Sequence, residues 1–466
     1  MACAVLIVAL AIRCIFLFAP GFANDQAQFI AWSEISRPGS TTVDGASHVC
    51  ATSTANCSLA DVYQLRSDGS GKRWCNYPPA YLYVLRVWAD IYNWLAPAGV
   101  TLDTTVWEAV LRGHDSAATR LAVALYKVPA VVADALLGAL LVVWVGRRVD
   151  RRWAAVVGLV YVCTPAVIHN STVWGQVDAI PTLLVVGSLE MARRRRVPLM
   201  LALAVLAVLT KAQAGVMLPV WLVVALRWTG SDWRRWASAA GTALAVSFVV
   251  LLPFRDALAG VWDAYAGAAT YYPFMHLNGF SAWFLANPMT TPHLDSVHTW
   301  YLRDDVPNLL GITARGWGMT GVLGVWVCAT VVLWRRRADE RSLFWAARLL
   351  PPAFFVLSTQ MHERYLFPAI AVWAWSFVHT RRWWACWILL CACASVNVLW
   401  AWAGPDDAVW ATWCGQTLHQ RWLGLLPGVW CSLILIGVLV AALVKGIDLR
   451  VKSRRTRTPL GRGQNR

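Results

Sequence analysis

The chain has 466 residues, of which 58% are hydrophobic and only 14% are charged, with 30 Trp and a formal net charge of +16. Soluble proteins carry about 25% charged residues, so this composition excludes an ordinary soluble domain. The basic residues lie in short loops between long apolar runs and not on a recognisable nucleic-acid-binding fold, so the expected partner is the lipid bilayer and no nucleic acid.

Twelve apolar runs are predicted to cross the membrane, so the expected fold is an all-α polytopic membrane protein with a single domain, residues 1–466. A helix needs about 20 apolar residues to cross a bilayer. The first run is preceded by no basic residue and followed by no small-residue cleavage site, so we expect a retained span and no cleaved signal peptide. The predicted spans are residues 3–20, 120–146, 153–169, 178–192, 197–210, 214–227, 236–254, 316–334, 342–358, 365–380, 384–402 and 425–445.

Six clusters of basic residues predict the orientation of these spans. With both termini in the cytoplasm, all six clusters fall on the cytoplasmic side, as the positive-inside rule requires. The long segments 21–119, 255–315 and 403–424 are then extracytoplasmic, and the basic tail, residues 446–466, is cytoplasmic and expected to be disordered. The clusters are Arg147 to Arg152, Arg193 to Arg196, Arg227 to Arg235, Arg335 to Arg341, Arg381 with Arg382, and the tail from Arg450.

Residues 79–97 form a further apolar stretch, which we interpret as an amphipathic helix on the outer surface. Arg86 and Asp90 interrupt the run, and counting it as a span would move the arginine clusters to the outside. A helix of this kind lies at the membrane interface with its apolar face buried. The first extracytoplasmic loop is therefore predicted to contain amphipathic helices.

The same loop holds Cys50, Cys57 and Cys75. Disulfides are allowed in an oxidising extracytoplasmic compartment, and a bond between Cys50 and Cys57 is predicted. No cysteine spacing typical of a metal site occurs. We therefore expect no metal and no cofactor.

Two motifs lie in the first outer loop. Asp25 places a carboxylate directly after the first span, with Gln28 following it and with Phe29 and Trp32 on one helix face. The structural alternative is that Asp25 caps the start of an amphipathic helix. Tyr77 precedes a proline pair that starts the surface helix, where a rigid turn is the simpler interpretation.

Two further motifs lie between predicted spans. Gln176 and Asp178 follow His169 and Asn170 at the junction of two spans, where they can hydrogen-bond a hydroxylated or phosphorylated ligand; helix capping by Asp178 is the alternative. Lys211, with Gln213 beside it, lies at membrane depth, where a cation needs a partner such as a lipid phosphate. A lysine that reaches the interface is the alternative.

Three adjacent ionisable residues form the last motif. His362, Glu363 and Arg364 lie between two predicted spans, and Arg can bind phosphate through two parallel hydrogen bonds while His donates to or shuttles a proton. Helix capping is the alternative role for Glu363. Within the spans, Asp134 lies two helical turns after Lys127, which suggests an internal pair or a structural polar site.

Taken together and in this order, the motifs resemble those of the GT-C superfamily of integral membrane glycosyltransferases over roughly residues 5–400. The likeness is greatest to the endoplasmic-reticulum glucosyltransferases that extend lipid-linked oligosaccharide and to bacterial GPI-mannosyltransferase-like proteins. Asn76 stands where the family has Asp, so no carboxylate role is assigned to it. The matching segments are Asp25 to Trp32, Asn76 to Tyr81, Lys127 to Leu137, Trp174 to Asp178, Lys211 to Gln213 and His362 to Tyr365.

The resemblance implies an inverting transfer of a hexose, with mannose favoured, from a polyprenyl-phosphate-linked donor to a glycan, lipid or protein acceptor at the extracytoplasmic face of the plasma membrane. It implies Asp25 as the general base and Lys211, His362 and Arg364 as the residues that stabilise the departing phosphate. The residues expected to contact the substrates are Gln28, Tyr77, Gln176, Asp178, Gln213 and Glu363.

Two other functions fit the composition. A transporter or lipid flippase would carry its polar residues within the spans near the membrane midplane, whereas here they lie mainly at the ends of predicted spans. A non-catalytic assembly partner is the third possibility. Convergence of Asp25, Lys211 and His362 in one outer cleft would favour the transferase, and a cavity that runs through the bundle would favour transport.

Overall fold

The computed structural model describes residues 1–36, 59–64, 75–96, 104–267, 272–286, 302–402 and 427–455. Within these ranges the chain is helical almost throughout and contains four strands of two or three residues, which confirms the all-α class. Cys50 and Cys57, and with them the predicted disulfide, lie outside the described residues. The end of the basic tail, after Arg455, lies outside them as well.

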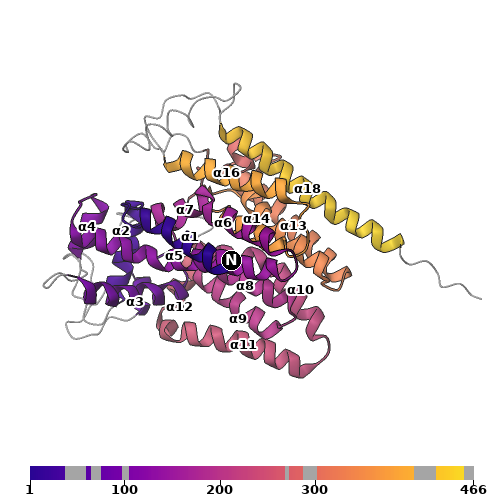
Figure 1. The fold of residues 1–466 in the computed structure, drawn as a ribbon, viewed down its shortest axis with the longest axis horizontal. Coiled ribbons are helices and arrows are strands. Elements are labelled where there is room, and N and C mark those ends of the chain that lie inside the picture. The colour runs from indigo at the N-terminus through magenta and orange to yellow at the C-terminus, as the bar shows by residue number, and fades with distance from the viewer. Residues whose placement is uncertain are drawn as a thin grey trace, which may run out of the picture.

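The helices follow one another along the chain and pack side by side (Figure 1). The α-helices are α1 Ala2–Phe16, α2 Ala23–Ile35, α3 Pro79–Leu95, α4 Thr104–Leu111, α5 Ala117–Gly146, α6 Arg151–Cys163, α7 Pro165–Ile168, α8 Ala179–Arg193, α9 Val197–Thr210, α10 Leu218–Thr229, α11 Trp233–Leu251, α12 Leu258–Gly267, α13 Ala314–Arg335, α14 Glu340–Leu357, α15 Phe367–Ser376, α16 Trp384–Trp402 and α18 Pro427–Arg455.

Short helical turns and strands connect them. The 3₁₀ helices are η1 Leu59–Gln64, η3 Ala212–Met217, η4 Leu252–Ala257 and η5 Ala282–Ala286, and η2 His169–Trp174 is a π-helix. The strands β1 His276–Leu277 and β4 Met361–His362 pair in parallel, and β2 Pro307–Leu309 and β3 Ile312–Thr313 pair antiparallel.

Each of the twelve predicted spans overlaps a helix or, at residues 153–169 and 214–227, consecutive helical segments. In the part of the chain that the structure describes, six helical segments are long and apolar enough to cross a membrane, and a seventh is added if the pair α6 and α7–η2, bent by 55°, counts as one. Helices α1, α9 and α15 are apolar but shorter. The membrane character of the chain is thus supported, and the number twelve remains a prediction. The six segments are Ala117–Gly146, Ala212–Thr229, Trp233–Gly267, Ala314–Arg335, Trp384–Trp402 and Pro427–Lys445.

Polar residues fix where several of these helices begin. The backbone N–H groups of the first helical turn have no partner within the helix, and a side chain at the N-cap accepts from them. Asp150 accepts from the Trp153 N–H at 2.9 Å at the start of α6, and Asp339 accepts from the Ser342 N–H at 2.8 Å at the start of α14. Ser116 forms a reciprocal capping box at the start of α5.

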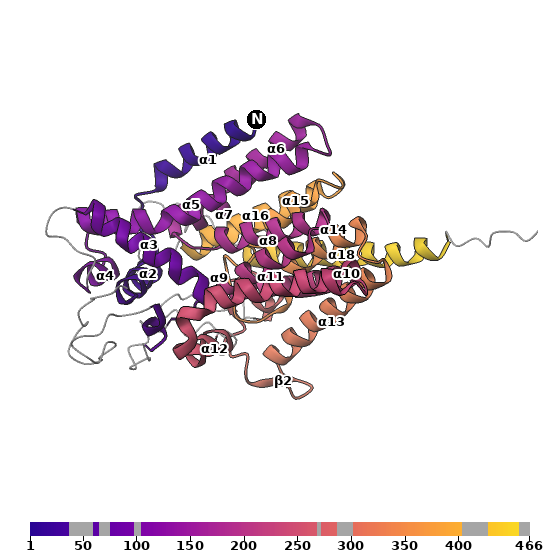
Figure 2. The same cartoon turned by 90° about the horizontal axis from the view of Figure 1, so that it is seen from below.

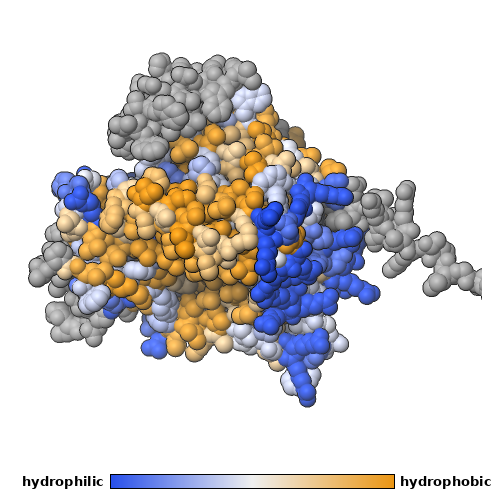
Figure 3. Space-filling model, viewed as in Figure 1, coloured by the Kyte–Doolittle hydropathy of each residue, from blue (hydrophilic) through white to orange (hydrophobic). Residues whose placement is uncertain are grey.

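Five arginine clusters meet at one end of the bundle, which we call the arginine end. Arg148 and Arg193 both lie beside Glu340, at 3.5 Å and 3.8 Å, so two clusters share a carboxylate that stands within the third cluster, Arg335 to Arg341. Arg381 pairs with Asp150, and Arg227 donates to the Trp334 carbonyl at 2.6 Å. Figure 3 shows hydrophilic side chains gathered at this end and apolar ones over the middle of the face.

Helices α2, α3 and α4 gather at the opposite end of the bundle in both views (Figures 1 and 2). Helix α3 has the predicted amphipathic pattern, because Tyr81, Leu85 and Tyr92 are buried on one face while Arg86 and Asp90 pair at 3.2 Å near the surface. Helix α2 differs from the expectation. Its side chains from Phe29 to Ile35 are all buried, so it is enclosed on every side instead of lying on the surface.

A buried polar cluster ties α1 to the helices around it. Arg13 pairs with Asp134 at 2.6 Å, and the hydroxyl groups of Tyr161 and Ser171 donate to the same carboxylate at 2.7 Å and 2.9 Å. The suggested pair between Asp134 and Lys127 is wrong. Lys127 instead donates to the backbone carbonyls of Leu17 and Ala19, because its side chain points toward the chain that leaves α1.

Candidate functional site

The predicted site residues come from separate segments that meet at the end of the bundle opposite the arginine end. Helices α8 and α9 each have a site residue at one end and an arginine cluster at the other. Asp178 stands at the start of α8 and Arg193 at its end. Lys211 follows the last residue of α9, whose start is next to Arg196. The similar lengths of α8 and α9 therefore place Asp178 and Lys211 at the same end of the bundle.

Asp25 lies in the first turn of α2, three positions after the N-cap residue Phe22. Its carboxylate accepts hydrogen bonds from the indole N–H of Trp174, at 2.8 Å, and from the side-chain amide of Gln176. The capping interpretation is therefore wrong, because the side chain is directed at another segment and not at its own helix. The position near a helix N-terminus still favours the carboxylate charge.

The segment around Gly175 holds the start of α2 in place. Gln26 donates to the Gly175 carbonyl at 2.9 Å, and the Phe22 N–H donates to the Trp174 carbonyl at 3.1 Å. Gly175 has φ +82°, and a Cβ at this position would stand 2.3 Å from Nε2 of Gln26. A glycine suits this position because side chains disfavour its left-handed backbone conformation and because a Cβ would displace the Gln26 amide from its place beside Gly175.

A second group of contacts connects this segment to Lys211. The hydroxyl of Tyr77 donates to Oε1 of Gln176 at 3.2 Å, and the Lys211 ammonium lies 5.7 Å from the centre of the Tyr77 ring. Asp178 occupies the N-cap position of α8 but makes no capping bond. Its carboxylate pairs with Lys211 instead.

Lys211 is only 8% exposed. Burial lowers the pKa of the Lys211 ammonium, and the charge of Asp178 opposes this effect. The interpretation of Lys211 as a cation that reaches the interface is wrong, since its charge is enclosed and paired. A buried ammonium of this kind is a positive charge held at a fixed point.

His362, Glu363 and Arg364 complete the group. Arg364 donates from Nη1 to Glu363 at 2.7 Å, and its guanidinium lies 5.3 Å from the centre of the Trp174 ring. Its Nε is buried and has no hydrogen-bond partner among the described residues. Arg364 therefore connects the Asp25–Trp174 contact to the His362 loop and keeps one donor available.

The charged groups in this loop shift one another's pKa values. Burial raises the pKa of Glu363, but the Arg364 guanidinium and His362 outweigh it and hold that pKa at about 2. Burial and the charge of Arg364 lower the pKa of His362, while Glu363, whose carboxylate is 3.8 Å from Nδ1, opposes them. Glu363 is thus a carboxylate at neutral pH and His362 is a neutral imidazole.

The short parallel pair of β1 and β4 places His362. Gly279 approaches Met361 so closely that a Cβ would stand 2.4 Å from the Met361 carbonyl oxygen. Asn397 holds the same turn from α16, because it donates to the Asn278 carbonyl at 2.5 Å and accepts from the Phe280 N–H at 2.9 Å. Two segments remote in sequence therefore fix the position of the histidine.

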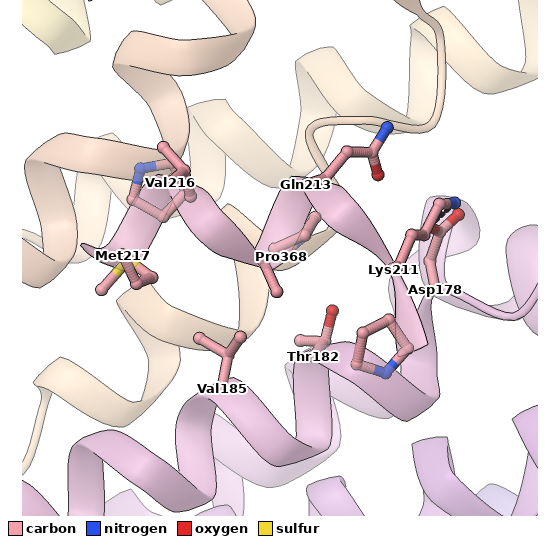
Figure 4. Close-up of a pocket in the computed structure, with 11 residues that line it drawn as sticks. Asp178, Thr182, Val185, Lys211, Gln213, Val216, Met217 and Pro368 are labelled. Atoms are coloured by element: carbon pink, nitrogen blue, oxygen red, sulfur yellow. Dashed lines mark hydrogen bonds and ion pairs between the residues drawn. The ribbon is translucent and has the colours of Figure 1, made fainter. Parts of the chain in front are cut away.

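A small pocket, with a volume of about 20 Å³, lies beside the ion pair of Lys211 and Asp178 (Figure 4). The polar side chains of Lys211, Asp178, Thr182 and Gln213 stand toward one end of it, and Met217 lies toward the other. The remaining lining residues are apolar: Pro181, Val185, Ala214, Val216, Pro351 and Pro368.

The structure thus brings most of the predicted site residues into one connected set of contacts, with Gln28 on the same face of α2 as Asp25, three positions later. Trp174 belongs to one of the sequence motifs but has no predicted role, and the structure shows that it contacts both Asp25 and Arg364. Its position directly before Gly175 and Gln176 was the available signal. Within the described ranges, no three His, Cys, Asp or Glu side chains are grouped as a metal site.

Comparison with known proteins adds no assignment. No protein-family model matches the sequence, and no curated protein matches it. The function must therefore be argued from the chemistry of the site.

Proposed function

We propose that the chain is an integral membrane glycosyltransferase that moves a hexose from a polyprenyl-phosphate-linked donor to an acceptor. The observation that carries the proposal is that Asp25 lies in one set of contacts with two cations, the buried Lys211 and the largely buried Arg364. Such a set offers a base for an acceptor hydroxyl beside a positively charged place for a phosphate. Mannose is the favoured hexose, and a glycan, a lipid or a protein is the acceptor.

The proposed topology follows from the charges. The arginine end lies in the cytoplasm, as the positive-inside rule requires. The helical segments that overlap the twelve predicted spans cross the membrane, and both termini are cytoplasmic. The site then faces the extracytoplasmic side of the plasma membrane, where the donor sugar is presented at the lipid surface.

Asp25 is the general base in the proposed reaction. Its carboxylate takes the proton of the acceptor hydroxyl while the oxygen attacks the anomeric carbon, and the bond from that carbon to the phosphate oxygen breaks. The sugar carbon gains positive character as the bond breaks. The electron pair leaves with the polyprenyl phosphate, and the configuration at the anomeric carbon inverts. The hydrogen bonds from Trp174 and Gln176 orient the carboxylate for this step.

Lys211 and Arg364 stabilise the departing phosphate. Each already faces a carboxylate, Asp178 and Glu363 respectively, so the phosphate shares the cations with these partners. The unpartnered Nε of Arg364 and the remaining ammonium protons of Lys211 are the available donors. His362, held as a neutral imidazole, can donate one further hydrogen bond.

The small pocket beside Lys211 has an apolar side that suits contact with the lipid part of the donor. Its apolar lining around Met217 and Val216 suits isoprene units, and its polar end coincides with the proposed phosphate site (Figure 4). The lipid tail would then leave the phosphate between α8, η3 and α14. Ligand pockets commonly combine such an apolar lining with a few placed polar groups.

A transporter or flippase is the main alternative, and two observations favour the transferase over it. The polar side chains converge at one end of the bundle and not at its middle. The polar cluster that does lie inside the bundle, around Arg13 and Asp134, is saturated, because both carboxylate oxygens of Asp134 accept hydrogen bonds from protein groups. A saturated pair leaves no position for a transported ion.

The test is an assay of purified protein in lipid vesicles. The donors are polyprenyl phosphates that carry mannose, glucose or arabinose, and the measured quantities are the release of free polyprenyl phosphate and the transfer of labelled sugar. We expect transfer from at least one hexose donor. Movement of the intact labelled lipid between leaflets without sugar transfer would instead establish a flippase.

A further inference from the structure

Two polar side chains of the π-helix η2 are buried without satisfying their hydrogen-bonding groups. His169 is 4% exposed and Asn170 is 1% exposed. Neither ring nitrogen of His169 nor either amide atom of Asn170 has a hydrogen-bond partner among the described residues. A buried polar group without its hydrogen bonds destabilises the folded protein, so these side chains are unfavourable unless another molecule supplies the partners.

The conformation of this segment is itself unusual. Single π-turns interrupt helices mostly at functional sites, and here the turn ends at Gly175, whose backbone N–H donates to the Asn170 carbonyl. The Gln176 N–H donates to the same carbonyl at 2.8 Å. Ser171, the next residue, has its hydroxyl satisfied by Asp134 at 2.9 Å. The turn is therefore anchored by its backbone and by Ser171, and not by the side chains of His169 and Asn170.

Aromatic rings surround the histidine. The His169 ring lies 4.9 Å from the Trp402 ring and 5.9 Å from the Trp174 ring, both edge to face, and the two indoles are 5.3 Å apart. Trp174 is also the residue that donates to Asp25. One indole thus separates the proposed base from a buried group of polar atoms without partners.

The chemistry of these atoms selects the kind of ligand. A neutral imidazole and a carboxamide offer donors and acceptors together, which suits hydroxyl groups, since each hydroxyl both donates and accepts. A phosphate would need cations. Lys127, the described cation that acts on His169, already donates to backbone carbonyls, and Arg364 is paired with Glu363. A metal ion would need more than one imidazole and one amide as ligands. Indole rings beside such atoms suit the apolar faces of a sugar ring.

We propose that His169 and Asn170 form a hexose-binding subsite, in which they hydrogen-bond ring hydroxyl groups of the sugar beside Trp174. The inference rests on the proposed function for the identity of the sugar, and it adds the residues that select it. The hexose is either that of the donor or that of a sugar acceptor, because both rings must stand near Asp25 during transfer.

The test uses substitutions that keep the shape and remove the hydrogen bonds, His169→Phe and Asn170→Leu. Replacement of an unsatisfied buried polar group by an apolar one of similar shape is neutral or stabilising, so both variants should fold with an unchanged or raised Tm. His379→Phe is the matched control, because His379 lies beyond the far end of α15 and stacks on Phe344 at 5.2 Å.

Two measurements separate the possible sources of the sugar. The first is the affinity for polyprenyl-phosphate mannose relative to bare polyprenyl phosphate, and the second is the KM for methyl mannoside as an acceptor. The donor subsite is identified if each variant lowers the affinity for polyprenyl-phosphate mannose, relative to that for bare polyprenyl phosphate, by about 3- to 10-fold. The same rise in acceptor KM, with donor affinity unchanged, identifies an acceptor subsite. The control should change neither quantity.

Folded variants that match the wild type in both measurements would overturn the subsite. That outcome leaves the proposed function standing if the wild-type protein transfers sugar. Conversely, a wild-type protein that transfers nothing, but binds the mannose-bearing lipid more tightly than the bare lipid in a His169-dependent manner, would defeat the proposed function and retain the subsite.

Discussion

The indole N–H of Trp174 and the carboxylate of Asp25 are 2.8 Å apart, although 149 residues separate them in the sequence. The contact joins the segment after the first helix to the turn before α8. It also brings Asp25 next to Arg364, whose guanidinium lies against the same indole. The proposed base and a proposed phosphate ligand therefore depend on one aromatic side chain for their relative position.

Asp25→Asn should separate catalysis from structure. Asn can still accept a hydrogen bond from Trp174 and nearly preserves the shape, but it cannot take a proton from an acceptor hydroxyl. We expect turnover in the vesicle transfer assay to fall by about 10²–10⁴-fold with donor binding unchanged. Asp115→Asn, at an exposed position, serves as the control. Wild-type turnover by a folded Asp25→Asn protein would remove the proposed mechanism.

Arg364→Gln should weaken the use of the donor lipid. The loss of a charge-assisted hydrogen bond to phosphate costs about 1.5–3 kcal/mol, or roughly 10- to 150-fold in donor KM. Arg364→Gln also leaves Glu363 without its partner, so Glu363→Gln/Arg364→Gln is the informative companion. If the double variant regains the wild-type donor KM, Arg364 acts on folding and not on phosphate.

The lowered pKa of His362 predicts that the stability of the folded protein depends on pH. The pKa of His362 in the folded protein is below the ordinary value of about 6.5, so below that pH the unfolded chain binds the extra proton and stability falls. Glu363 has a pKa of about 2 in the folded protein and about 4.3 in the unfolded chain, so it is mostly ionised in both states above pH 5 and contributes little to the change. We expect the Tm to drop between pH 7 and pH 5, and to drop less in His362→Gln. An equal drop in both proteins would contradict the assignment.

The buried ion pair of Arg13 and Asp134 should stabilise the fold only while both residues are present. Arg13→Met leaves the carboxylate uncompensated among apolar helices, which typically costs about 3–5 kcal/mol. Arg13→Met/Asp134→Leu removes both charges and should recover most of the lost thermal stability. Thermal unfolding in detergent measures both. A single variant as stable as the wild type would show that the pair is not structural.

The orientation of the bundle can be tested with a matched pair of cysteine substitutions. Arg195→Cys lies at the arginine end and Asp115→Cys at the opposite end, both at exposed positions. In a protein whose native exposed cysteines are replaced by alanine, a membrane-impermeant reagent added outside should label position 115 and not position 195. Labelling of position 195 alone would reverse the proposed topology.

The sequence by itself determined the all-α class of the molecule and the approximate positions of its apolar helices. Long apolar runs separated by arginines can be satisfied only by helices that bury their own backbone hydrogen bonds, and each predicted span overlaps a helix. The same runs predicted that residues such as Asp178 and Lys211 stand at the helix ends opposite the arginines. These conclusions depend on local composition and on the rise per residue of a helix, which sequence spacing records directly.

Only the tertiary structure decided which groups the polar side chains contact and in which direction these side chains point. The spacing of Lys127 and Asp134 suggested a pair, but α1 brings Arg13 to that carboxylate and directs Lys127 to backbone carbonyls. In the same way, Asp25 and Asp178 had the positions of capping residues, yet their carboxylates contact Gln176 and Lys211 on other segments. A side chain at a helix end chooses between its own backbone and a neighbour by distance, and the packing of remote helices sets that distance.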